Sequence, residues 1–341
     1  MMLNSLRSQL SPIGLVHDSH EFRAVQLIRS RGKVQPIACA NFPRMDGRTG
    51  SVQPDEYRWA GAILARQGMV GSQLAIIPDS GWCSSHMLEL PPVPEEGAKL
   101  QLARAEVARS KKCLPQDFEI ACWDLPKRGR SSESMAVACT RAPLSASLDV
   151  LEEAGLNALA VDLPEMAILR TLSESNQSPD ITGILHIGWR DSLVVILNQG
   201  ITVYHRRVEV GLEEISNRLG AQLALDPQTI AYLLERVQHG ELGEHERPIR
   251  GMWQGFIRSL VENLDVAIGY VSHAYRSSEL GSVYISGYGG ANTDLVDQLT
   301  ATLGMPVHTL INPTLLEAGY SPAQCARFAL PYGLAARFDK P

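Results

Sequence analysis

Three short segments of the sequence carry residue types that could handle a phosphate group. They are VHDSHE at residues 16–21, HIGWRD at 186–191 and GYGGA at 287–291. Glycines let the backbone approach a ligand closely, and successive N–H groups in a turn form a concave site for an anion. Carboxylates beside such turns can hold hydrated Mg²⁺, because phosphoryl transfer depends on positioning and charge neutralisation. A glycine cluster such as 287–291 equally makes a plain strand-to-helix turn, and that interpretation stays open.

Other kinds of chemistry find little support in the sequence. The chain has no P-loop, HExxH or GxSxG motif. Its six cysteines include no CxxC pair, and several lie inside apolar runs. Such residues are typical of buried free thiols in a reducing compartment, not of a disulfide framework or a zinc site. We therefore assign no catalytic residue and no metal ligand.

Length and charge narrow the class of protein. The chain has 341 residues, enough for two lobes of roughly 150 residues each. A net charge of −6 argues against a nucleic-acid partner, because nucleic-acid binders usually carry a basic face. No segment reaches the ~18 apolar residues of a membrane-spanning helix. The apolar stretch at the N-terminus is too short for a signal peptide. We expect a cytoplasmic protein with no membrane span of its own.

Sequence patterns predict the elements of the first half. Residues 21–30 alternate between two faces, as a strand does. In 95–112, acidic residues come early and lysines late, an order that the helix dipole favours. An α+β unit is expected as an insertion at about 81–142. Strands are expected at 13–18, 21–30, 34–43, 74–78, 83–91, 117–125, 134–142 and 156–164. Helices are expected at 55–66, 95–112, 145–155 and 165–175.

The second half follows a polar segment with a proline, SNQSPD at 175–180, which is the best linker candidate. In 247–277, apolar residues recur every three or four positions and predict a long helix with one face in the core. That face carries Phe256, Leu260, Leu264, Ile268, Val271 and Tyr275. Strands are expected at 183–189, 191–198, 200–210 and 305–312, helices at about 211–240 and 325–338, and a strand, glycine turn and helix within 282–304. Pro331 and Gly333 should break the last helix.

Each half opens with the same plan, in which a strand enters a tight turn, a second strand leaves it and a third follows. This duplication resembles the actin-like (ribonuclease H-like) architecture, an α/β fold in which two lobes face each other across a nucleotide cleft. The resemblance implies a first lobe at 1–175, which includes the inserted unit at about 81–142. The second lobe would be 176–341, with a C-terminal helix that returns to the first lobe.

Particular stretches resemble one family of this fold, the PilM proteins of type IV pilus assembly. The family begins like IGLDIGSSSIKAVEL, and this chain reads IGLVHDSHEFRAVQL at 13–27. The family's insertion, with a strand, a proline pair and an acidic helix, matches MLELPPVPEEGAKLQLARAEVARSKKCLPQDFEIACWDL at 87–125. Residues 150–172 and 183–219 also follow the family's order. The chain is similar to MshI and to the cytoplasmic part of GspL as well, but no membrane helix follows, so PilM is the better match.

The resemblance implies a nucleotide cleft that has lost its acids. The family carries an acid in the first turn where this chain has Val16, and in the second where it has His186. Trp189 fills a position that is usually small. We expect no bound cofactor and a pseudo-ATPase; the alternative is an active Mg²⁺-dependent actin-like ATPase that binds ATP and Mg²⁺. If a nucleotide does bind, the matching positions are Asp18, Ser19, Arg23, Gly188, Gly287, Gly289 and Gly290.

The same resemblance would bring His17, Asp18, His20 and His186 around one cleft. Imidazole and carboxylate groups can hold a metal ion. Ordinary hydrogen-bonded side chains are the other interpretation of these residues, and it is the one that we prefer.

The resemblance implies a scaffold at the inner face of the inner membrane, active in fimbrium biogenesis, rather than an enzyme. PilM proteins bind the N-terminal tail of a PilN-like bitopic inner-membrane protein, and they contact the pilus motor ATPases. In this chain the tail would lie extended against the first lobe, near its junction with the inserted unit, held by strand addition or groove packing. The candidate groove residues are Met87, Leu88 and Leu90, with the helix at 95–111 beside them.

Overall fold

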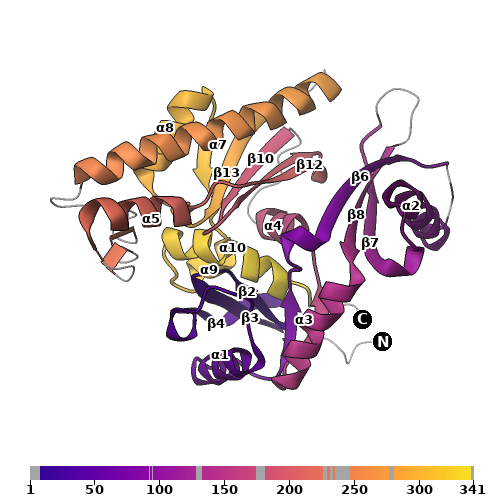
Figure 1. Cartoon of the computed structure of the whole chain (residues 1–341), viewed down its shortest axis with the longest axis horizontal. Coiled ribbons are helices and arrows are strands. Elements are labelled where there is room, and N and C mark those ends of the chain that lie inside the picture. The colour runs from indigo at the N-terminus through magenta and orange to yellow at the C-terminus, as the bar shows by residue number, and fades with distance from the viewer. Residues whose placement is uncertain are drawn as a thin grey trace.

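A computed structural model of the chain describes residues 8–91, 93, 95–127, 133–173, 181–225, 229–230, 233–234, 246–275 and 280–338. Two large sheets lie one above the other, a small third sheet stands to one side, and helices fill the layers between and outside them (Figure 1). The expected linker at 175–180 lies outside the described residues. The division into lobes at that point therefore stays a prediction.

The first sheet has the strand order β1-β3-β2-β5-β9, and β4 pairs with β3. Its strands are β1 (Gln9–Leu10), β2 (Ile13–His17), β3 (Glu21–Ser30), β4 (Lys33–Pro43), β5 (Gln73–Ile76) and β9 (Asn157–Val161). β2 is apolar along most of its length because helices cover both of its faces. Ile13 and Leu15 pack toward α1 (Pro54–Arg66) and α3 (Arg141–Glu153), while Val16 packs with residues of α4 (Pro164–Ser173) and α10 (Pro322–Ala335).

The inserted unit is a three-stranded antiparallel sheet with one helix. It contains β6 (Cys83–Glu89), α2 (Glu96–Lys111), β7 (Phe118–Asp124) and β8 (Glu133–Thr140), in the order β6-β8-β7. α2 packs on one face of this sheet, where Val107 meets Phe118 and Ala136. The opposite face turns toward the second lobe, since Met135 belongs to the core of that lobe.

The second sheet has the order β12-β11-β10-β13-β14. Its strands are β10 (Ile181–Ile187), β11 (Ser192–Asn198), β12 (Ile201–Val208), β13 (Leu280–Gly287) and β14 (Val307–Thr309). The helices of this part are α5 (Leu212–Leu223), α7 (Glu246–Ala274), α8 (Thr293–Leu303) and α9 (Pro313–Glu317). The predicted core face of the long helix is confirmed, because five of its six residues are buried and Ile268 packs against the same core.

The repeated plan is confirmed strand by strand. β2, β3 and β4 form an antiparallel meander in the first sheet, and β10, β11 and β12 form one in the second. In each sheet a later strand, β5 or β13, then runs parallel to the first strand of the meander. None of the helices in the described ranges is both long and apolar enough to span a bilayer.

The last helix, α10, is continuous, so the expectation that Pro331 and Gly333 would break it is wrong. Tertiary packing stabilises it instead. A Cβ on Gly333 would lie 1.8 Å from the carbonyl oxygen of Ala167 in α4, and a Cβ on Gly14 of β2 would lie 2.1 Å from that of Pro331. The Arg170 Nε donates to the Gly333 carbonyl at 2.8 Å. α10 therefore packs tightly between β2 and α4, and this contact outweighs the helix-breaking tendency of proline.

Candidate functional site

The first turn, which links β2 to β3, is filled by one of the chain's own carboxylates. The Oδ1 of Asp18 accepts hydrogen bonds from the backbone N–H groups of His20 at 2.8 Å and Glu21 at 3.0 Å. Arg44 fixes the turn from its other side: its Nη1 donates to the Asp18 carbonyl at 2.9 Å, and its Nε pairs with buried Glu56 at 2.6 Å. The N–H groups that could cradle a phosphate therefore already have an anionic acceptor.

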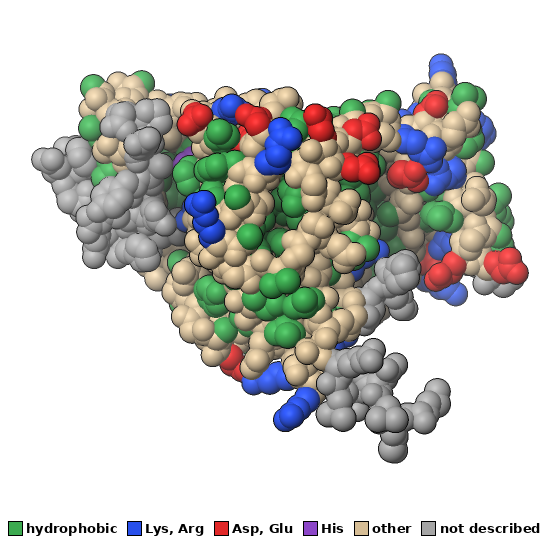
Figure 2. Space-filling model, turned by 90° about the horizontal axis from the view of Figure 1, so that it is seen from below, with side chains coloured by type: hydrophobic (Ala, Val, Ile, Leu, Met, Phe, Trp, Pro, Cys, Tyr) green, Lys and Arg blue, Asp and Glu red, His purple; other side chains and the backbone are tan. Residues whose placement is uncertain are grey.

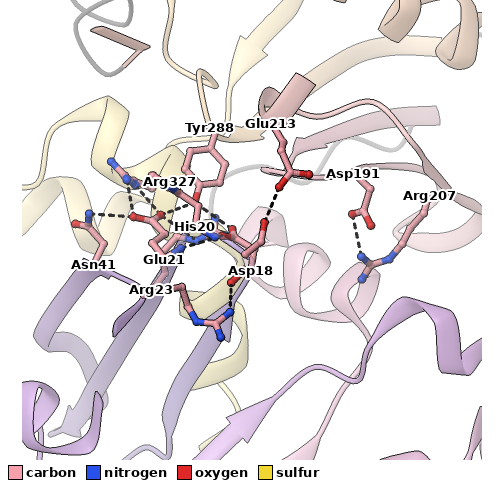
Figure 3. Close-up of polar contacts among 12 residues, drawn as sticks. Asp18, His20, Glu21, Arg23, Asn41, Asp191, Arg207, Glu213, Tyr288 and Arg327 are labelled. Atoms are coloured by element: carbon pink, nitrogen blue, oxygen red, sulfur yellow. Dashed lines mark hydrogen bonds and ion pairs between the residues drawn. The ribbon is translucent and has the colours of Figure 1, made fainter. Parts of the chain in front are cut away.

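Tyr288 connects the two lobes at this turn (Figure 3). It lies in the glycine turn after β13, and its hydroxyl contacts Asp18 Oδ2 at 3.0 Å and Glu21 Oε1 at 2.8 Å. Burial raises the pKa of Tyr288, and the charges of Glu21 and Asp18 raise it further. The hydroxyl therefore stays protonated, although with one proton it can donate to only one carboxylate at a time.

Two arginines balance these two carboxylates. Arg23 Nη2 pairs with Asp18 at 3.1 Å, and Arg327 Nη2, from α10, pairs with Glu21 at 2.6 Å. Both guanidinium groups lie over the Tyr288 ring, at 4.8 Å and 5.4 Å from its centroid. Glu21 and Arg23 are each 2% exposed, so these two charges depend on their partners to stay in the site.

Aromatic rings fill the space between the first and second turns. The His20 ring stacks on Trp189 with centroids 3.9 Å apart and an interplanar angle of 12°, and Trp189 meets Tyr288 edge-on at 5.6 Å. Burial lowers the pKa of His20, so the stack uses the neutral imidazole. Beside it, the Ser19 hydroxyl donates to Glu213 Oε1 at 3.0 Å. The first lobe thus meets the second through direct side-chain contacts.

A neutral imidazole lies at the start of the second turn. His186 Nδ1 lies 2.9 Å from the Ser286 hydroxyl. Burial lowers the pKa of His186 to about 3, and the charges of Arg23 and Arg207 add to the effect. A Cβ on Gly188 would lie 2.1 Å from the Asp191 carbonyl oxygen, so this glycine is required by the turn itself.

The glycines of the third segment also have structural reasons to be glycine. Gly287 has a φ of +83°, and a Cβ there would lie 2.1 Å from the Ile187 carbonyl oxygen. A Cβ on Gly290 would lie 3.1 Å from Ala326 of α10, and one on Gly289 would lie 3.3 Å from Trp253. The plain-turn interpretation accounts for all three.

The histidines of the cleft do not converge on one point. His17 Nε2 lies 3.0 Å from the Tyr57 hydroxyl, whereas His186 bonds to Ser286. Within the described ranges, no three or more His, Cys, Asp or Glu side chains are arranged to hold a metal ion. These two imidazoles are ordinary hydrogen-bonded side chains.

A second candidate site lies where β6 and β12 face each other, each of them the end strand of its sheet. A cavity of about 400 Å³ opens there, beside the N-terminus of α4. We call it the β6–β12 groove. Its lining residues are Pro78, Ser80, Gly81, Cys83, Ser85, Val137, Leu163, Pro164, Glu165, Asp191, Leu193, His205, Arg206, Arg207 and Glu209.

Glu165 is the buried charge of the β6–β12 groove. Its side chain is 3% exposed, and its Oε1 has no hydrogen-bond partner among the described residues. His205 Nδ1 lies 3.3 Å from that oxygen, and His205 Nε2 lies 3.0 Å from the Ser85 hydroxyl of β6. Farther along, Arg207 pairs with Asp191 at 3.0 Å (Figure 3). The groove thus contains a carboxylate that could accept a hydrogen bond from a ligand.

The three residues predicted for a partner groove do not lie together. Met87 points toward the second lobe, where its Sδ lies 3.8 Å from the Tyr270 hydroxyl. Leu88 packs on the α2 side of the sheet, because successive residues of a strand face opposite ways. Leu90 is buried just after β6 ends. Of the three, only Met87 shares the face that Cys83 and Ser85 present to the β6–β12 groove.

Charged side chains of both signs are interspersed on the face seen in Figure 2, and they do not gather into a broad patch of one sign.

Comparison with known proteins decides the family. Residues 105–330, well over half of the chain, match the family model described as type IV pilus assembly protein PilM. The chain belongs to the PilM family. No curated protein sequence matches it significantly.

Solved structures agree on the fold of this PilM-family protein. The structure described as a PilM–PilN type IV pilus biogenesis complex superposes with a TM-score of 0.77 at 17% identity, over 97% of this chain and 99% of the other. The ethanolamine utilization protein EutJ from Carboxydothermus hydrogenoformans gives a TM-score of 0.52 at 14% identity, over 98% and 91%. The predicted actin-like fold class is confirmed.

Sequence reasoning on the PilM resemblance found some cleft residues and missed others. Asp18 and Arg23 do meet in the first turn. Glu21, Tyr288 and Arg327 were not predicted, although a Glu and an Arg two positions apart within an apolar strand are a signal that a charge network lies nearby.

Proposed function

We propose that this PilM-family protein is a scaffold of a type IV pilus or related machine, recruited to the cytoplasmic face of the inner membrane by the N-terminal tail of a PilN-like protein. Family membership supports the pilus role. The similar fold of the PilM–PilN complex supports a partner of the PilN kind. Contacts with motor ATPases are part of the same proposal.

The proposed binding site for the tail rests on the β6–β12 groove. β6 and β12 are both end strands, so each leaves a row of backbone N–H and C=O groups unpaired by its own sheet. An extended peptide can add to such an edge through main-chain hydrogen bonds, with alternate side chains entering pockets. The cavity of about 400 Å³ beside these edges supplies the pocket. We place the tail here rather than on Leu88 and Leu90.

Glu165 indicates which kind of side chain the groove would accept. A buried carboxylate oxygen with no hydrogen-bond partner is costly, and a cationic group of the tail would satisfy it. Arg207, which also lines the groove, is already paired with Asp191. The proposed ligand is therefore an extended tail with a basic side chain.

The test uses a synthetic N-terminal tail of a PilN-like protein and fluorescence anisotropy. We expect micromolar or tighter binding, and about a tenfold or greater loss in Glu165→Gln, because the buried charge pair is removed. Glu153→Gln, on the exposed end of α3, is the matched control and should bind like wild type. Absence of binding at micromolar concentration would argue against the proposal, and equal affinity of Glu165→Gln would place the tail elsewhere.

We also propose that the cleft between the two lobes stays closed by its own side chains when no nucleotide is present. Asp18 takes the backbone N–H groups of the first turn, and Tyr288 occupies the space between the glycine turn and that carboxylate. A ligand that binds only the folded state, at a free concentration of 100 times its Kd, would stabilise the folded protein by about 2.7 kcal/mol. We expect millimolar ATP with Mg²⁺ to leave the melting temperature unchanged. A clear Mg²⁺-dependent rise would favour the alternative, an active ATPase.

A further inference from the structure

Cys83 and Cys139 lie directly opposite each other on neighbouring strands. The antiparallel register of β6 and β8 pairs these two residues, and their thiols are hydrogen-bonded to each other. Opposite residues of an antiparallel pair have Cβ atoms about 4.5–5.5 Å apart, and a disulfide needs about 3.5–4.5 Å. A closure of about 1 Å therefore suffices to join the two sulfurs.

The pair is reachable from solvent through the β6–β12 groove. Cys83 is half-buried and is part of the groove lining, as is Val137, which lies on the same face of β8 as Cys139. Cys139 itself is 7% exposed. A molecule as small as hydrogen peroxide can thus reach the pair, whereas a bulky oxidant would meet Cys83 first.

One thiol of the pair ionises more readily than three buried thiols elsewhere in the chain. The hydrogen bond between the two thiols lowers the pKa of Cys139, while the same bond and burial raise that of Cys83. Burial raises the pKa of Cys39 to about 12 and that of Cys325 to about 11. It also raises the pKa of Cys122, on β7 of the same small sheet. Because the thiolate is the nucleophile, these three thiols should react more slowly than Cys139.

We propose that Cys83 and Cys139 form a site of reversible oxidation, at which hydrogen peroxide converts the two thiols into an intrachain disulfide. In the first step, a thiolate sulfur attacks the peroxide O–O bond, and hydroxide leaves to give a sulfenic acid. In the second step, the neighbouring thiol attacks that sulfur, the S–S bond forms, and water leaves. Overall, two thiols and one peroxide give one disulfide and two waters, and a dithiol reductant reverses the change.

The disulfide would act on the β6–β12 groove, a consequence that rests on the proposed tail site. Joining the sulfurs draws the first residue of β6 toward β8. Ser85, two residues farther on the same face, holds His205, which in turn contacts Glu165. The oxidised protein should therefore bind the tail with an affinity changed by about threefold or more.

The site itself is tested on the full-length protein without any partner. Reduced protein is treated with hydrogen peroxide, blocked with N-ethylmaleimide, digested and analysed by mass spectrometry. We expect a linked peptide that joins Cys83 to Cys139, lost after dithiothreitol, while Cys39, Cys122 and Cys325 remain alkylated. Alkylation of Cys83 and Cys139 to the same extent as the other thiols would overturn the proposal.

Variants guard against a nonspecific result. In Cys83→Ser, Cys139 should stop at a sulfenic acid that dimedone traps, and no intrachain link to another cysteine should form. Cys122→Ser is the matched control from the same sheet, and it should keep the Cys83–Cys139 link. A new link from Cys139 to a different cysteine in Cys83→Ser would show that the pairing is not specific, and the proposal would fail.

Tail binding is then compared between the reduced and the oxidised protein. A changed affinity supports control of the groove, and an unchanged affinity with a complete disulfide overturns that part. If the reduced protein binds no tail although the disulfide forms, the proposed function fails while the oxidation site stands. The two failures are therefore distinguishable.

Discussion

Tyr288 brings a single hydroxyl to two buried carboxylates, and each of those carboxylates also has a guanidinium partner. The arrangement resembles a bound ligand in its contacts, since one group from the second lobe meets two acceptors on the first. The difference is that the chain itself supplies the group. A side chain that is covalently attached never dissociates, so the contacts it makes do not depend on any concentration.

Replacing Tyr288 with Phe tests how much this hydroxyl contributes. The ring is kept, but Asp18 and Glu21 lose the one donor that they share, so we expect the unfolding free energy to fall by about 1–3 kcal/mol. Tyr270→Phe is the matched control: the residue is 40% exposed, and its change should stay within about 0.5 kcal/mol. Urea denaturation measures both. Equal effects of the two substitutions would contradict an important role for the Tyr288 hydroxyl.

One buried histidine predicts how stability depends on pH. His186 is 6% exposed, and burial lowers its pKa from 6.5 to about 3. Between that value and 6.5 the unfolded chain binds more protons at this position than the folded one. Stability should therefore be full above about pH 6.5 and fall toward acid, by about 1.4 kcal/mol per pH unit for this histidine.

The pH dependence is measured from urea midpoints at about pH 7.5 and about pH 5. His186→Asn keeps a polar partner for Ser286. In this variant the unfolding free energy should fall less between the two pH values than in wild type, because one titrating histidine is gone. A variant with the same pH slope as wild type would mean that His186 titrates normally in the folded protein.

Single-residue predictions from sequence succeeded where partners are near each other in the chain. Asp18 and Arg23 are five residues apart and face each other across one turn. Tyr288 and Arg327 lie 267 and 306 residues from Glu21, which they both contact. No local pattern encodes such a distance. The side chains that close the cleft could therefore be found only once the strands and α10 had been placed.

Among the elements, strands with clear alternation were predicted almost to the residue. The strand expected at 21–30 is β3, Glu21–Ser30, because charged and turn residues bound an apolar core on both sides. β1 and α9 were not predicted, since two and five residues carry too little periodicity to detect. The break expected in the last helix was wrong because Pro331 and Gly333 were judged without their packing partners.

Gly333→Ala tests the crossing of α10 and α4. An added Cβ would lie 1.8 Å from the Ala167 carbonyl oxygen, so the helices must separate. We expect a loss of about 2–4 kcal/mol. Gly269→Ala is the matched control on α7, where a Cβ meets nothing within 4 Å. That substitution should stabilise the protein by about 0.5–1 kcal/mol, because alanine favours a helix. Thermal denaturation that ranks the two variants the other way would refute the tight crossing.

For the whole molecule, the repeated meander was enough to predict two facing lobes, but not how firmly they are joined. Contacts between residues far apart in sequence connect the lobes, among them those of Tyr288 with Asp18, Ser19 with Glu213, and Ser85 with His205. The Trp123 indole adds a hydrogen bond to the Thr202 carbonyl at 2.8 Å. These contacts tie the inserted unit and both sheets into one body.

This connection predicts a single cooperative unfolding transition, although chains of this length often unfold in steps. Tryptophan fluorescence and far-UV circular dichroism should give the same urea midpoint. In a Tyr288→Ala, Arg327→Ala double variant the two signals should separate, whereas Lys33→Ala, which removes only an exposed ion pair with Glu317, should leave them coincident. Two transitions in the wild-type protein would mean that the lobes unfold independently.

α10 follows almost all of the fold in chain order, yet it covers strands that come near its beginning. Val25 and Leu27 of β3 are buried against Phe328 and Tyr332, roughly 300 residues later in the sequence. A ribosome adding about 5–20 residues per second would need about 15–60 s to cover that distance. Until then the first sheet presents an apolar face that α10 has not yet covered. A chain truncated before α10 would keep that face exposed and should be prone to aggregate.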